Sequence, residues 1–201
     1  QTPVFMMTDL DIGMNQRLCK PLKWDDATEY DRGQVMTAEM LDAGKEFGRY
    51  LDVDGDGIPF RTYPGTHPST GGYFPRGTSK NAYAIYSEAG PDYKYNMQRL
   101  LKKFETAKAL VPKPLLSASK EPARFGAIYY GSTSPAMAEA LDALSRQGSY
   151  VNALRVRAFP FQDGIFGFVA SHSKGFLIEQ HRDGHAKTLP VNATGVHPAS
   201  A

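Results

Sequence analysis

The feature that most constrains the fold is a regular alternation of strand and helix patterns between residues 124 and 180. Three short apolar runs are typical of buried strands, and two longer segments between them carry helix start and stop signals. Consecutive strands in such a chain pair in parallel, through right-handed crossovers. The second half is therefore predicted to be an α/β domain with a parallel sheet. The strand patterns are RFGAIYYG, NALRVRAF and KGFLIEQ, and the helix patterns are AMAEALDALSRQG and QDGIFGFVASH.

The first segment, PVFMMTDLDIG at residues 3–13, is a short apolar run that ends in polar residues and a glycine. It predicts a buried parallel strand whose carboxyl end delivers Thr8, Asp9 and Asp11 to a loop. An apolar strand needs neighbouring strands to pair with. We therefore expect a fragment, or a chain that completes its fold against residues outside this sequence.

The middle of the chain is predicted to be a long connection with two helices. Residues 15–36 follow neither the helix nor the strand period, and Thr37 is placed to cap a helix that runs to Leu51. Residues 57–92 are dense in Gly, Pro, Ser, Thr and Tyr, so no long helix or strand is expected there. Their aromatic side chains argue against disorder and favour a segment that lies on another surface, such as that of a partner. Residues 93–111 predict a helix with an apolar stripe made of Met97, Leu100, Leu101, Phe104, Ala107 and Val111.

The stretch DVDGDGIPF, from residue 52 to residue 60, begins like a calcium-binding loop. Asp52, Asp54 and Asp56 stand at the first, third and fifth positions, and Gly57 follows. The twelfth position, which needs a bidentate glutamate, holds Tyr63 instead. Asp and Gly are also strong turn formers. A structural turn is the favoured interpretation, and a metal held by the three aspartates is the alternative.

Two other motifs have simple structural explanations. GSTSPAM, at residues 131–137, lies between a strand and a helix, where α/β proteins often bind anions, but capping by Ser134 accounts for it. His181 and His185 are four residues apart, and a loop position is preferred to a helical metal site because Gly184 separates them. Glu179, Arg182 and Asp183 fall at the carboxyl end of the preceding strand, where functional residues gather, and a local ion pair explains them equally well.

Composition limits the classes of partner and compartment. The 23 Lys and Arg residues nearly balance the 21 Asp and Glu residues, which predicts neither a nucleic-acid interface nor a basic membrane patch. One cysteine, Cys19, excludes a disulfide framework and a cluster ligated by this chain alone. The sequence contains no apolar run of about 20 residues to span a bilayer. A soluble, cytoplasmic protein is expected.

Several strings in this sequence are long and unusual. They are PVFMMTDLDIGMN, WDDATEYDRG, AGKEFGRYLDVDGDGIPFRTYPGTHP, YFPRGTS, NMQRLLKKFETAKALVP and YYGSTSPAMAEALDAL. Together they resemble one family, the alpha subunit of 2-oxoacid:ferredoxin oxidoreductases of the 2-oxoglutarate type. The resemblance extends from about residue 2 to about residue 198, and FRTYPGTHP beside DVDGDGIP is its most specific part. EQHRDGH departs from the usual family pattern.

This resemblance implies a thiamine-diphosphate enzyme that decarboxylates a 2-oxoacid, yields an acyl-CoA and passes electrons to ferredoxin. Thiamine diphosphate, Mg²⁺ and the iron–sulfur cluster would lie mainly on a beta subunit. Residues 1–36 would end a pyrimidine-binding-type thiamine domain, residues 37–118 would form the loop-rich connection, and residues 119–201 would be a transketolase-C-terminal-like domain.

No catalytic residue can be transferred from the family, because its catalytic segments precede this sequence. Thr8, Asp9, Asp11 and Asn15 would support a loop near the thiamine site, and the chain alone would be inactive. The competing hypotheses are a small module that binds Ca²⁺ through Asp52, Asp54 and Asp56, and an assembly element without a ligand.

Overall fold

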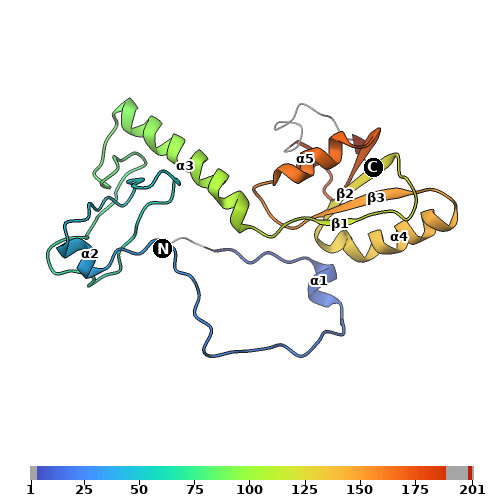
Figure 1. Cartoon of the computed structure of the whole chain (residues 1–201), viewed down its shortest axis with the longest axis horizontal. Helices are drawn as coiled ribbons and strands as arrows, with labels where there is room; N and C mark the ends of the chain where they lie inside the picture. The colour runs from blue at the N-terminus through green and yellow to red at the C-terminus, as the bar shows by residue number, and fades with distance from the viewer. Residues whose placement is uncertain (1–3, 189–198, 201) are drawn as a thin grey trace. The chain divides into compact units, whose positions relative to one another are not determined.

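The computed structural model describes residues 4–188, 199 and 200 of the 201-residue chain (Figure 1). The chain divides into two compact units, which we call the sheet unit (residues 1–22 and 111–201) and the connection unit (residues 23–110). These divisions lie at different positions from the predicted boundaries after residues 36 and 118. The assignment of the units to named thiamine-enzyme domains stays a prediction.

The sheet unit contains the parallel sheet that the strand and helix alternation predicts. Its strand order is β1-β3-β2-β4-β5, in which β2 pairs in parallel with both β3 and β4. β1 is an antiparallel edge strand on β3, and β5 is a short parallel strand on β4. The bounds are Leu115–Ser117 (β1), Phe125–Tyr130 (β2), Val151–Val156 (β3), Lys174–Ile178 (β4) and Ala199–Ser200 (β5).

Two helices cover opposite faces of this sheet, as the side chains of β2 show. Ala127 and Tyr129 pack with Met137 of α4 (Ser134–Arg146), whereas Ile128 between them packs with Ile165 of α5 (Asp163–Ala170). Successive side chains of a strand point to opposite faces, so one strand supplies both cores. Both predicted crossover helices are confirmed.

Strand β1 was not predicted from the sequence. All three of its side chains are exposed, so no alternation of apolar and polar residues marks it. It exists because its backbone pairs with the edge of β3, with Leu116 opposite Leu154.

The strand predicted at residues 3–13 is wrong. Residues 4–9 have no regular structure, and a short helix, α1, spans Leu10–Met14. Val4, Phe5, Met6 and Met7 are exposed. A strand forms only beside another strand, and within the described residues none pairs with this segment.

The connection unit has two helices joined by irregular chain, as predicted. Thr37 caps α2 (Ala38–Asp42) as expected, by accepting a hydrogen bond from the backbone N–H of Met40. The helix is much shorter than predicted because Gly44, at φ +78°, terminates it. The N–H of Gly44 donates to the Leu41 carbonyl and that of Lys45 to the Met40 carbonyl, the Schellman pattern.

The long helix α3 (Gly90–Leu110) confirms the predicted element but not the use of its apolar stripe. Its buried residues are Asn96 and Arg99, while Met97, Leu101 and Phe104 are exposed. The polar side packs on the irregular chain through hydrogen bonds to backbone carbonyls, from Asn96 to Lys80, Arg99 to Gly57 and Thr106 to Asp56. Among the described residues, no helix has the length and apolar character that crossing a bilayer requires.

Candidate functional site

A cavity of about 460 Å³ lies at the carboxyl ends of β2, β3 and β4 in the sheet unit. The crossovers that leave β2 and β3 diverge to opposite faces there, and open α/β sheets bind ligands at this kind of switch point. Ile128, Val156, Ile165 and Leu177 give it an apolar lining. Its other lining residues are Tyr130, Gly131, Arg157, Ala158, Phe159, Phe161, His185 and Ala186.

Two charged residues, Arg157 in the lining of this cavity and Glu179 next to the lining residue Tyr130, follow the ends of strands. Arg157 follows β3 and makes no ion pair or hydrogen bond with the residues that the structure describes. Glu179, after β4, accepts hydrogen bonds from the Tyr130 hydroxyl (3.3 Å) and from the Ala186 backbone N–H (3.1 Å). Burial, and then the negative charge of Glu179, raises the pKa of the Tyr130 hydroxyl.

This cavity can bind a small ligand with an apolar body and an anionic group that faces Arg157. Its described lining contains no Ser, Thr or Cys, and the hydroxyl that contacts a carboxylate is that of Tyr130, which donates to Glu179. Arg157 was missed in the sequence, although its position directly after a strand was the available signal.

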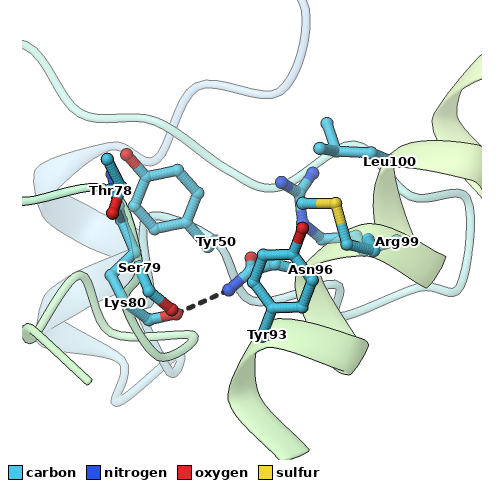
Figure 2. Close-up of a pocket in the computed structure, with 9 residues that line it drawn as sticks. Tyr50, Thr78, Ser79, Lys80, Tyr93, Asn96, Arg99 and Leu100 are labelled. Carbon is cyan, nitrogen blue, oxygen red and sulfur yellow. Dashed lines mark hydrogen bonds between the residues drawn. The ribbon is translucent and has the colours of Figure 1, made fainter. Parts of the chain in front are cut away.

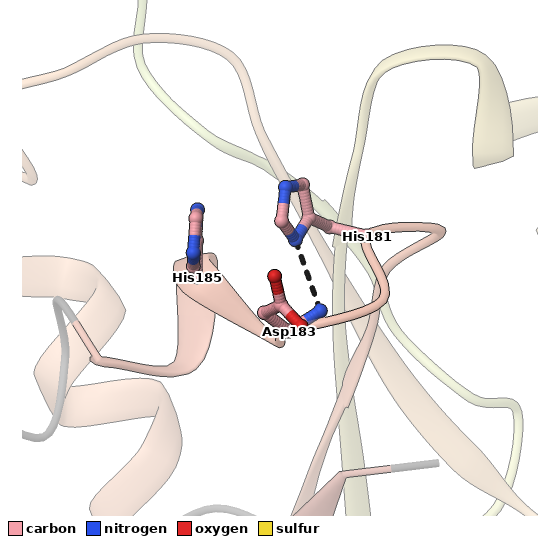
Figure 3. Close-up of side chains that lie close together, drawn as sticks. All are labelled: His181, Asp183 and His185. Carbon is pink, nitrogen blue, oxygen red and sulfur yellow. Dashed lines mark hydrogen bonds between the residues drawn. The ribbon is translucent and has the colours of Figure 1, made fainter.

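His181 and His185 lie close together (Figure 3), and His185 also lines this cavity. Their rings stack with centroids 4.0 Å apart, and ligand atoms of His181, Asp183 and His185 lie within 4.8 Å of one another. However, the Asp183 carboxylate is paired with Arg182 at 2.7 Å, and His181 Nδ1 accepts a hydrogen bond from the Asp183 backbone. The predicted loop position of His181 and the predicted ion pair are confirmed, and His185 begins a helical segment at residues 185–188.

Capping of α4 by Ser134 is wrong. The helix begins at Ser134 itself, whose hydroxyl donates to the Gly131 carbonyl, and Thr133 at the N-cap position makes no side-chain cap. A short 3₁₀ turn, η1 (Gly131–Thr133), joins β2 directly to α4 and displaces the expected cap. Its Ser132 hydroxyl donates instead to the Asp9 carboxylate at 2.7 Å.

The four residues predicted near a thiamine site form two groups. Asp9 caps α1 through the Ile12 backbone N–H (2.8 Å) and reaches the sheet through Ser132. Asp11 accepts hydrogen bonds from the Asn15 side-chain amide and from Arg17. The Thr8 hydroxyl only approaches the Asp9 carbonyl, at 3.5 Å. Their role near a cofactor stays a prediction.

Replacing Ser132 with alanine is expected to raise the pKa of Asp9. The Ser132 hydroxyl and then the Ile12 N–H hold this pKa below its ordinary value, because both hydrogen bonds favour the charged carboxylate. A lowered pKa means that the contact is fully formed at neutral pH and weakens as the pH falls through the pKa of Asp9. NMR titration of the Asp9 carboxyl carbon measures the change, and Ser134→Ala, which leaves Asp9 untouched, is the control.

The predicted turn at residues 52–57 is confirmed. The Asp52 carboxylate accepts hydrogen bonds from the backbone N–H groups of Gly55 (2.9 Å) and Gly57 (3.1 Å). Gln34 Nε2 donates to both Asp54 (2.9 Å) and Asp56 (3.0 Å). The ligand oxygens of the three aspartates lie within 4.8 Å of one another, and a metal on them stays a prediction.

Asp52→Ala is expected to destabilise the connection unit by about 1–3 kcal/mol, because two turn N–H groups lose their acceptor. Asp54→Ala, which removes one exposed contact with Gln34, should cost under about 1 kcal/mol. Urea unfolding gives both values. The same proteins titrated with Ca²⁺ should give no saturable heat, and micromolar binding that disappears in Asp54→Ala would instead establish the metal site.

Comparison with protein-family models and with curated protein sequences gives no match. A solved structure of 2-oxoglutarate:ferredoxin oxidoreductase from Magnetococcus marinus, with 2-oxoglutarate, coenzyme A and succinyl-CoA bound, matches 79% of this chain. The TM-score is 0.67 and the identity 19%, and the match spans 28% of that protein's chain. The alpha chain of a probable 2-oxoacid ferredoxin oxidoreductase from Thermoplasma acidophilum is 22% identical over 42% of this chain and 74% of its own, but its TM-score of 0.28 supports no argument. The chain therefore shares its fold with part of the Magnetococcus oxidoreductase.

Proposed function

We propose that this chain is part of the alpha subunit of a 2-oxoacid:ferredoxin oxidoreductase and that its 2-oxoacid is 2-oxoglutarate. The observation that carries the proposal is the fold similarity to the Magnetococcus enzyme over 79% of the chain. It agrees with the family that the sequence strings resemble. The substrate follows from the 2-oxoglutarate and succinyl-CoA bound to that enzyme.

The proposed reaction converts 2-oxoglutarate and coenzyme A to succinyl-CoA, CO₂ and one proton, and two ferredoxins each accept one electron. Thiamine diphosphate would supply the carbanion chemistry of the decarboxylation. The chain's single cysteine does not provide the four thiolates of an iron–sulfur cluster, so the cluster would be held elsewhere in the complex, and the family resemblance assigns it to the beta subunit. The residues of this chain would support and cover the site.

Exposed apolar side chains support a role inside a larger assembly. Val4, Phe5, Met6 and Met7 follow one another in the sheet unit with exposed fractions of 82% or more. Contiguous apolar surface of this kind marks protein–protein contacts. We assign this surface to contact with the rest of the oxidoreductase, the beta subunit in particular. A calcium module is less well supported, because the Asp52 carboxylate already accepts two backbone hydrogen bonds.

The test is to purify the intact polypeptide that contains this chain from its own cells and to assay what accompanies it. A brown, cluster-bearing subunit should co-purify, and the complex should reduce ferredoxin with 2-oxoglutarate and coenzyme A. Pyruvate should be a much poorer substrate. Turnover by the 201-residue chain alone, or a complex without a cluster-bearing subunit, would overturn the proposal.

A further inference from the structure

The connection unit contains a polar pocket that the proposed function does not use (Figure 2). Its volume is about 190 Å³, which is room for an ion such as phosphate, since one water takes about 30 Å³. Residues of α3 form one wall and the segment Thr78–Lys80 forms the other. The lining residues are Tyr50, Thr78, Ser79, Lys80, Tyr93, Asn96, Met97, Arg99 and Leu100.

Arg99 is the charged group of this pocket with the least access to water. It is 7% exposed, and one terminal nitrogen donates to the Gly57 carbonyl at 3.0 Å. Its Nε is buried without any hydrogen-bond partner among the described residues. Burial lowers the pKa of the guanidinium, which is the expected effect when a cation loses water without gaining an anion. A buried N–H donor of a charged group without an acceptor is costly unless a ligand supplies one.

Asn96 in the same pocket has a buried acceptor without a donor, whereas Arg99 has a buried donor without an acceptor. Its amide nitrogen donates to the carbonyls of Lys80 (2.6 Å) and Asp92 (3.3 Å), the first of which is drawn in Figure 2. These two acceptors fix the orientation of the amide, because a flipped group would turn its oxygen toward them. Asn96 Oδ1 therefore faces away from them, buried and without a described donor. The pocket needs a ligand that accepts from Arg99 and donates to Asn96.

The surroundings favour a ligand with more than one negative charge. The Nζ of Lys80 and the guanidinium carbons of Arg49 and Arg99 lie 5.3, 5.5 and 5.8 Å from the centre of the Tyr50 ring. Within the described part of the chain, none of these three cations forms an ion pair. Asp52 is the carboxylate whose charge acts on Arg99, and it is already occupied by the turn.

We propose that this pocket binds a phosphate group, as hydrogen phosphate or as a small phosphate ester that carries a hydroxyl. Arg99 Nε and Lys80 contact its oxygens from two directions, which suits a tetrahedral anion better than a planar carboxylate. The hydroxyls of Thr78, Ser79 and Tyr93, which make no hydrogen bond to described residues, complete the donor set. Asn96 Oδ1 accepts a hydrogen bond from the ligand's own O–H group.

Calorimetry on the 201-residue chain with inorganic phosphate tests the proposal. Binding should be saturable, and Lys80→Gln should weaken it about tenfold, the value of one charge-assisted hydrogen bond. Lys102→Gln removes an exposed cation of α3, the helix that carries Arg99, at a position outside the pocket. It should leave the affinity for phosphate unchanged. Arg99→Lys keeps the charge but removes Nε and should weaken binding by a similar factor. Circular dichroism checks that each variant is folded. If Arg99→Lys does not fold, the affinity of Lys80→Gln for phosphate is the deciding measurement.

Three other anions sharpen the result. Sulfate has the shape and charge of phosphate but no proton for Asn96, so it should bind several-fold more weakly. The affinities of glycerol phosphate and of inorganic phosphate are compared, and the tighter of the two shows whether the pocket prefers an ester or the free ion. Acetate should not compete with phosphate for the pocket. Absence of saturable phosphate binding, equal binding by Lys80→Gln, or a preference for acetate would each overturn the proposal. These measurements involve no turnover, so they neither support nor weaken the proposed oxidoreductase function.

Discussion

Replacing Gly57 with alanine is expected to lower the free energy of unfolding of the connection unit by about 4 kcal/mol, which is enough to unfold it in many backgrounds. Gly57 has φ +79°, a conformation that costs alanine about 1–2 kcal/mol. A Cβ there would also lie 2.4 Å from the Lys103 backbone nitrogen and 2.7 Å from the Arg99 carbonyl oxygen. These are helix backbone atoms, so they cannot move aside as a flexible side chain could.

Gly55→Ala is the matched control for this prediction. Gly55 has nearly the same φ, +77°, and no heavy atom lies within 4 Å of the position its Cβ would take. The free energy of unfolding of Gly55→Ala should therefore fall only by the cost of the positive φ, about 1–2 kcal/mol. Hydrogen exchange of the α3 amides in urea separates this unit from the sheet unit. Equal losses in the two variants would show that contact between Gly57 and α3 does not hold the unit together.

Ile165→Ala is expected to destabilise the sheet unit by about 3 kcal/mol. Ile165 is 2% exposed and packs with Ile128, Leu154 and Leu177 beneath α5. Truncation removes buried apolar area and extends the cavity that Ile165 already lines, so the surrounding side chains lose packing contacts.

Leu144→Ala, on the partly exposed side of α4, is the comparison for Ile165. Its cost should be under about 1 kcal/mol, because its side chain is 37% exposed. Urea unfolding followed by circular dichroism measures both. A loss from Leu144→Ala as large as that from Ile165→Ala would contradict the assignment of Ile165 to the buried core on the α5 side of β2.

The sheet unit was the most predictable part of the chain. β2, β3 and β4 are short apolar runs, and Pro135 and Gly148 mark the ends of the intervening helix, so local signals agree with the tertiary fold. β1 carries no such pattern, because its exposed side chains are unconstrained and only pairing with β3 defines it. Its position follows from a contact between segments distant in the chain.

The candidate sites were less predictable, because their groups belong to separate segments. Asp9 and Ser132 are hydrogen-bonded although they are far apart in the sequence. Arg99 is a candidate ligand-binding residue because it is held by the Gly57 carbonyl while its Nε has no hydrogen-bond partner among the described residues. The sequence does identify Asp52, Asp54 and Asp56, since three carboxylates at a fixed spacing can be recognised without tertiary information. The apolar stripe of residues 97–111 predicted a helix correctly but not which of its sides is buried, because periodicity says nothing about the partner surface.

The attachment of α3 by side chains that bond to carbonyls has a thermal consequence. When this helix detaches, it releases polar groups to water and uncovers little hydrocarbon, so the heat capacity of the chain should change only slightly. The free energy of this opening should therefore change almost linearly with temperature. The free energy of unfolding of the β-sheet core should instead follow a curve, because its melting exposes apolar surface.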